Sequence, residues 1–122
     1  MCLDKSHWFP KISRKPIKVY KIFNEYNGEL HTPYQGYICK CGDTIKAAKS
    51  WISGLLTMYI GGEGVHAYSM CSMHALREMD IITDNEDIDA ALYVCEIPPF
   101  TPYWIGNYGD IAASKMIVKK RI

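Results

Sequence analysis

The sequence predicts an α+β fold, in which a small mixed or antiparallel sheet packs with one or two helices. Stretches whose apolar residues recur every two positions lie near both ends of the chain, and stretches with a three- to four-residue recurrence lie between them. Strand and helix patterns do not alternate regularly, which argues against a parallel sheet. At 122 residues, the chain has the length of a single domain, residues 1–122, with one hydrophobic core.

The first quarter of the chain predicts an irregular arm followed by a hairpin. Residues 1–16 contain two prolines and show no apolar period, so we expect an arm that Trp8 and Phe9 pin to the body. Residues 17–23, IKVYKIF, are rich in strand-forming side chains and predict a strand. Asn27 and Gly28 then mark the turn of a hairpin.

Two helices are expected in the middle of the chain. Asp43 can cap a helix whose apolar residues recur as far as Leu56, although residues 43–47 can instead complete the preceding strand. Ser69 can cap a second helix over residues 70–79.

Further strands are predicted at residues 64–69, at residues 91–97 and, as one long final strand, at residues 111–122. A single core would then bury side chains from both ends of the chain and from the second helix. The predicted core residues are Val19, Leu76, Val94, Ile97 and Ile117.

The composition excludes several classes of protein. The formal net charge of +1 gives no general attraction for phosphates, so we expect no duplex nucleic acid partner, and we interpret the basic segments near the two ends as strands with one wet face. No apolar run reaches the roughly 18 residues of a membrane span, so we expect no membrane partner. The odd number of cysteines, five, and the absence of a secretion signal predict free thiols in the cytoplasm.

The sequence predicts neither a metal site nor a nucleophilic catalytic site. Cys39, Cys41, Cys71 and His74 are zinc-ligand types, but a single residue between the first two places their thiols on one strand face about 7 Å apart, so we expect no metal. Cys71 and His74 lack a glycine elbow, so we assign no catalytic residue. The segment GGEG is interpreted as a turn, because it lacks the lysine of a phosphate loop.

The best candidate for a ligand site is the segment GVHAYS at residues 64–69. A strand there turns His66 and Tyr68 to one face and Val65 and Ala67 to the core, so we expect the first pair at the rim of a cleft. A buried histidine bonded to a backbone carbonyl is the alternative. The nine tyrosines and three tryptophans add planar, amphipathic surface for a ligand. Further candidate contacts are Tyr20, Tyr34 and Trp104.

Four segments carry a family resemblance: GYICKCGDTIKA, GEGVHAYSMCSMHAL, LYVCEIP and GDIAASKMIVKK. In this order, from Tyr37 onward, they resemble a small uncharacterised domain family of bacteriophage and mobile-element proteins. The order is also similar, more weakly, to the later part of the ADP-ribosyltransferase-like fold. That similarity implies a cleft at residues 64–69 and places the catalytic glutamate of such enzymes near Ser114 or Lys115. Neither residue is a carboxylate, so the resemblance implies lost chemistry and leaves both as candidate ligand contacts.

These observations predict a non-catalytic protein that binds a small ligand, with a nucleotide or nucleotide-derived signal as the leading candidate and no cofactor. Two alternatives stay open. One is an ADP-ribosyltransferase-like enzyme with an unusual acid. The other is a module that pairs an exposed strand edge with a partner protein.

Overall fold

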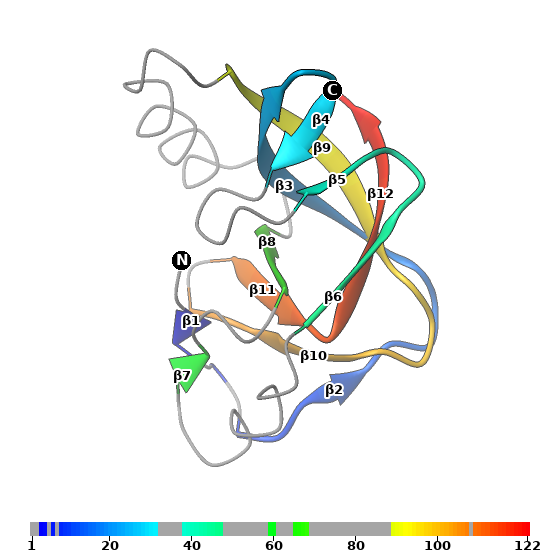
Figure 1. The fold of residues 1–122 in the computed structure, drawn as a ribbon. Helices are drawn as coiled ribbons and strands as arrows, with labels where there is room; N and C mark the ends of the chain where they lie inside the picture. The colour runs from blue at the N-terminus through cyan, green and yellow to red at the C-terminus, as the bar shows by residue number, and fades with distance from the viewer. Residues whose placement is uncertain are drawn as a thin grey trace.

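The computed structural model describes residues 3–4, 6, 8–31, 38–47, 59–60, 65–68, 89–107 and 109–122. Every regular element in these residues is a β-strand, and every pairing between strands is antiparallel. The α+β prediction is therefore wrong, because the described part of the chain forms an antiparallel all-β fold (Figure 1).

The main sheet has ten strands in the order β2-β10-β11-β8-β3-β9-β12-β6, with β4 and β5 branching from β3. Its strands are β2 (Lys11–Ile12), β3 (Ile17–Tyr26), β4 (Glu29–His31), β5 (Ile38–Cys39), β6 (Thr44–Lys46), β8 (Val65–Tyr68), β9 (Asp89–Ile97), β10 (Pro102–Ile105), β11 (Asp110–Ala113) and β12 (Lys115–Arg121). A separate two-stranded sheet pairs β1 (Leu3–Asp4) with β7 (Tyr59–Ile60).

The central strands form a ring that we call the barrel, which is completed by the chain connection from β5 to β6 and not by a pairing between these two strands. β3 pairs with β4, β4 pairs with β5, β6 pairs with β12, and β9 links β12 back to β3. A turn at residues 40–43 joins β5 to β6. Gly42 fits this turn because its φ is 95°, and its N–H donates to the Val118 carbonyl at 2.8 Å. In Figure 1 the teal segment that carries β5 and β6 runs from β4 to the side of β12.

Side chains that alternate along the surrounding strands fill the barrel. The core cluster includes Val19 and Phe23 of β3 and Cys95 of β9. The rings of Phe23 and Tyr93 meet edge to face, with centroids 5.5 Å apart. Ile22 of β3 is also buried, although its side chain projects to the opposite face of the strand from Val19 and Phe23. The long central strand β3 is therefore covered on both faces over its middle residues.

The first hairpin is confirmed. β3 covers the predicted strand and extends it to Tyr26. Asn27 and Gly28 have φ angles of 50° and 78°, the pair of left-handed residues that a two-residue hairpin turn needs. The strand predicted at residues 91–97 is confirmed as β9.

The helix predicted from Asp43 is wrong at its start. Ile45 is buried between the exposed Thr44 and Lys46, which is the two-residue alternation of a strand, and it enters the barrel core. The remainder of that helix and the helix predicted at residues 70–79 lie outside the described residues.

The single final strand predicted at residues 111–122 is two strands, β11 and β12, separated by a bend at Ser114. The Ser114 N–H donates to the Pro102 carbonyl at 3.1 Å and holds this corner. Met116 and Val118 face the core, whereas the predicted core residue Ile117 is only partly buried. Three other predicted core residues, Val19, Val94 and Ile97, are buried, and Leu76 lies outside the described residues.

The N-terminal arm is less irregular than predicted, because it contains β1 and β2. β2 pairs with β10, and the Ser6 N–H donates to the Ile105 carbonyl at 3.0 Å. Phe9 is 75% exposed, so its ring is not buried against the body as predicted. Backbone pairing and side-chain hydrogen bonds hold the arm in place.

Candidate functional site

Strand register brings four of the seven candidate ligand residues to one face of the sheet. Tyr20 of β3 pairs with Tyr68 of β8. His66 of β8 pairs with Ala112 of β11, which pairs in turn with Trp104 of β10. Residues directly opposite each other on paired strands project to the same face. We call the set Tyr20, His66, Tyr68 and Trp104 the His66 face.

The opposite face of β8 belongs to the barrel. Val65 and Ala67 are members of the core cluster, as the two-residue period predicts. His66 is itself 7% exposed, and Tyr68 is buried as well. The imidazole therefore lies inside the molecule rather than at the open rim that the sequence predicted. Tyr20 is partly exposed, so it is the most accessible member of the His66 face.

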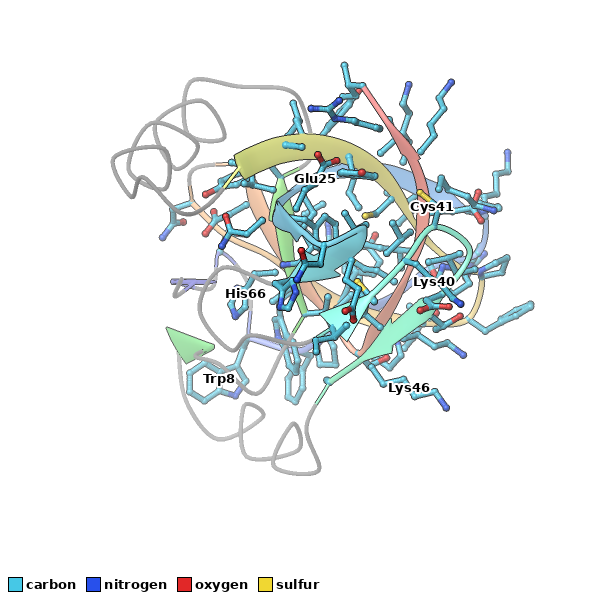
Figure 2. All side chains as sticks on the ribbon, turned by 45° about the horizontal axis from the view of Figure 1, so that its top comes forward. Trp8, Glu25, Lys40, Cys41, Lys46 and His66 are labelled. Carbon is cyan, nitrogen blue, oxygen red and sulfur yellow. The ribbon has the colours of Figure 1, made fainter. Side chains whose placement is uncertain are left out.

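An additional aromatic residue, Trp8, adjoins the His66 face. The Trp104 indole Nε1 donates a hydrogen bond to the Trp8 carbonyl at 3.1 Å, which ties the arm to β10. Trp8 is 46% exposed, whereas Trp104 is fully buried. Figure 2 shows Trp8 and His66 on the same side of the molecule, opposite Lys40 and Lys46. Sequence reasoning did not single out Trp8 as a site residue.

A buried carboxylate, Asp110, also belongs to this region and was missed. It is the residue of β11 that pairs with Tyr68. Its carboxyl group packs against Gly106, where a Cβ would overlap the carboxyl atoms. The Gly106 N–H donates to the Asp110 carbonyl at 2.8 Å. The sequence feature that could have indicated this contact is Gly106, which lies four residues before Asp110 in the turn between β10 and β11.

The side chain of Lys21 links β3 to the backbone of β8, the strand that carries His66. It is buried, and its Nζ donates to the His66 carbonyl at 2.6 Å. The ammonium also lies 5.8 Å from the centre of the Phe23 ring. This hydrogen bond holds the backbone of the strand that carries His66.

The buried thiols are not nucleophiles. Burial raises the pKa of the Cys95 thiol to about 12, against the opposing effect of Lys21. Burial likewise raises the pKa of Cys39 to about 11, and Asp43 adds to the effect. Both groups are protonated at neutral pH, and the thiol form reacts poorly.

The zinc hypothesis finds no support among the described residues. Cys39 is buried at the end of β5, whereas Cys41 is exposed in the following turn. No group of three potential ligands occurs within the described residues. Cys71 and His74 lie outside them.

The remaining candidate ligand residues are placed elsewhere. Tyr34 lies outside the described residues. Ser114 forms the bend after β11, and its carbonyl accepts a hydrogen bond from the Ala47 N–H at 2.8 Å. Lys115 is paired with Lys46 of β6. Neither Ser114 nor Lys115 is a register partner of Tyr20, His66, Tyr68 or Trp104.

A second polar cluster lies at a different position on β3 and β9. The Tyr93 hydroxyl donates to Glu25 Oε1 at 2.5 Å, and Arg121 Nε lies 3.3 Å from the same oxygen. Burial raises the pKa of Tyr93 to about 12, and the hydrogen bond to Glu25 contributes. This arrangement joins β3, β9 and β12.

Comparisons of the chain with protein-family models, curated proteins and solved structures found no match. Within the part of the chain that the structure describes, no helix has the length and apolar character needed to cross a membrane.

Proposed function

We propose that the protein binds a small ligand without catalysing a reaction, and that the ligand is a nucleotide or a nucleotide-derived signal. The observation that carries the proposal is the strand register of the His66 face. It gathers two phenols, an imidazole and an indole from the three strands β3, β8 and β10. Ligand sites typically combine aromatic surface with a few such polar groups.

Tyr20 is the contact that favours a nucleotide. Its ring is partly exposed, so a planar base can stack on it. Lys18 is exposed, and its Nζ lies 5.7 Å from the centre of the Tyr20 ring. A base stacked on the ring would thus bring its phosphate close to an ammonium group.

A binding role fits the chemistry of the described residues better than catalysis does. The thiols of Cys39 and Cys95 are protonated and buried. Lys115, near the place where the weaker resemblance puts a catalytic glutamate, carries the opposite charge. A cation there would oppose the positive charge that develops as a glycosidic bond breaks.

We also propose that the protein works in the cytoplasm. Cys39, Cys41 and Cys95 are all free thiols, and two of them are buried. Free thiols persist in reducing compartments.

A thermal-shift screen with nucleoside mono-, di- and triphosphates, cyclic dinucleotides and NAD tests the proposal. At about 100 times its dissociation constant, a ligand that binds only the folded state adds roughly 2.7 kcal/mol to the free energy of unfolding. We expect one nucleotide class to raise the melting temperature. Tyr20→Ala should then raise its dissociation constant about tenfold, or roughly 1.4 kcal/mol, and leave the melting temperature of the free protein nearly unchanged.

Ile38→Ala is the matched control, because Ile38 is exposed on β5 and is not part of the His66 face. It should leave the dissociation constant unchanged. Equal losses in the two variants, or no response to any nucleotide, would contradict the proposed function.

A further inference from the structure

The turn between β9 and β10 holds an exposed aromatic residue in an unfavourable backbone conformation. Phe100 has a φ of 61° and is 79% exposed. Left-handed φ angles are rare for bulky side chains, and residues held there often mark functional sites. Glycine would adopt this conformation without a steric penalty. The ring also gains little from burial, so packing within the chain does not explain the residue.

Ser13 fixes the turn from the adjacent arm. Its N–H donates to the Thr101 carbonyl at 3.1 Å, and its carbonyl accepts from the Phe100 N–H at 2.6 Å. Its hydroxyl donates to the Pro98 carbonyl at 2.6 Å and accepts from the Thr101 N–H at 2.9 Å. Ser13 and Thr101 are both buried. The strained turn is therefore held rigidly, with the Phe100 ring directed to solvent.

More exposed apolar side chains lie on the arm that packs beside this turn. Ile12 of β2 pairs with Pro102, two residues after Phe100, and is exposed. Trp8 and Phe9 precede it on the same arm and are also exposed. Most other large apolar side chains of the described residues are buried in the sheet.

The same segment is basic. Lys11, Arg14 and Lys15 are exposed, and residues 8–18 contain no acidic residue. The two ion pairs found among the described residues, Lys119–Glu96 and Arg121–Glu25, lie on another part of the sheet. The arm therefore presents positive charge to solvent, although the whole chain is nearly neutral.

We propose that this surface binds single-stranded nucleic acid. The surface consists of Trp8, Phe9, Ile12 and Phe100 with Lys11, Arg14 and Lys15, and we call it the arm-and-turn surface. Exposed aromatic rings stack on bases regardless of sequence, and the interspersed cations neutralise the backbone phosphates. A single strand is the polyanion that offers both kinds of contact, because its bases are free to stack.

Two other partners fit the surface less well. Interfacial membrane-binding segments are typically amphipathic helices, whereas this arm is extended and pairs with β10. Strand addition by a partner protein needs an open edge. β2 is an edge strand, but it has only two residues and is flanked by Pro10 and Pro16, which lack the N–H for pairing.

Fluorescence anisotropy with a labelled oligothymidylate of about 20 nucleotides tests this inference. Phe100→Gly should weaken binding about tenfold, because it removes one stacking ring. It should leave the melting temperature equal to or above that of the wild type, because glycine relieves the left-handed strain. Phe100→Ala should weaken binding equally without raising the melting temperature. A purely structural role for Phe100 would not separate affinity from stability in this way.

The cations are tested through the salt dependence. Replacing Lys11, Arg14 and Lys15 by Gln should reduce the slope of log K against log salt concentration by about 2, at roughly 0.7 per phosphate contact with a single strand. Lys120→Gln on β12 is the control for an exposed cation outside the arm-and-turn surface, and Ile38→Ala is the control for an exposed apolar residue outside it. Both should leave binding unchanged.

Several outcomes would overturn the inference. The first is that the protein does not bind the oligonucleotide. The second is that it binds duplex DNA equally well and that substitution of Phe100 does not change this affinity. The third is that it binds anionic phospholipid vesicles or an acidic protein but not the oligonucleotide. Tyr20→Ala separates the two proposals, because it should impair nucleotide binding at the His66 face and leave oligonucleotide binding intact. The arm-and-turn surface can thus fail or succeed independently of the proposed function.

Discussion

The side chain of Lys21 supplies a hydrogen bond to the backbone of β8 where the pairing of β3 with β8 does not. Among the described residues, β3 and β8 are paired through Tyr20 and Tyr68, and the backbone of His66 is not part of that ladder. The Lys21 ammonium donates to the His66 carbonyl and satisfies a buried acceptor that the strand pairing leaves open. An unmade hydrogen bond of this kind costs about 1–3 kcal/mol. The position of the imidazole thus depends on a residue of the neighbouring strand.

The contact between Gly106 and Asp110 gives a test at the level of single atoms. Gly106→Ala should lower the free energy of unfolding by about 1–3 kcal/mol, because the new methyl group overlaps a buried carboxyl group that cannot move freely. Urea denaturation measures the change. In an Asp110→Ala background the same substitution should cost much less, because the obstructing atoms are gone. Equal costs in both backgrounds would show that the overlap is not what limits Gly106.

Individual elements differ in how well the sequence predicts them. The hairpin from β3 to β4 was predictable because Asn27 and Gly28 favour the left-handed angles that the turn uses. β6 was misread because Ile45 fits a helical spacing as well as a strand spacing, and only its pairing with β12 decides between them. Short strands such as β6 and β10 obtain their stability from partners distant in sequence, which local patterns do not show.

The candidate site was predictable to a similar degree. Alternation along residues 65–68 correctly separated His66 and Tyr68 from the core side chains. Trp104 was named as a further aromatic candidate, but its place beside His66 depends on the register of β10 and β11, which the sequence does not show. The sequence also did not reveal the depth of His66, since burial depends on what packs against the whole face.

β9 is the element whose packing is tested most directly. Val94 is buried on the face of β9 away from the barrel, so Val94→Ala should lower the free energy of unfolding by about 1–3 kcal/mol. Glu96→Ala, on the same strand and partly exposed, should change it by about 1 kcal/mol or less. Chemical denaturation of both variants provides the comparison. A neutral result for Val94→Ala would mean that the outer face of β9 is not packed.

At the scale of the whole molecule, buried ionisable groups make the free energy of unfolding depend on pH in the alkaline range. Cys39, Cys95 and Tyr93 are each more easily deprotonated in the unfolded chain than in the folded one, because burial raises the pKa of all three. When folding raises the pKa of an acid, the folded state binds the proton more tightly. The resulting stability is complete below the ordinary pKa and is lost as the pH rises toward the folded pKa.

We therefore expect the contribution of these three groups to the free energy of unfolding to be constant up to about pH 8. It should fall from about pH 9, where unfolded thiols ionise, to about pH 12, where the folded groups also ionise. Urea denaturation at several pH values measures the profile. Cys95→Ala should flatten the decline between pH 9 and pH 11, whereas the exposed Cys41→Ala should leave it unchanged. A profile identical in the wild type and Cys95→Ala would contradict this account.

The pairing of β3 with β9 has a consequence for the synthesis of the chain. Ile17 pairs with Ile97, and Glu25 pairs with Asp89, so the strand at the centre of the sheet is made long before its main partner. At ribosomal rates of about 5–20 residues per second, the interval from residue 26 to residue 89 lasts roughly 3–13 s. During that time β3 has only its short hairpin with β4 and, once residue 68 is made, its pairing with β8, and both lie on the edge opposite to that of β9. The edge of β3 that later pairs with β9 thus stays uncovered for seconds, which favours aggregation of the nascent chain.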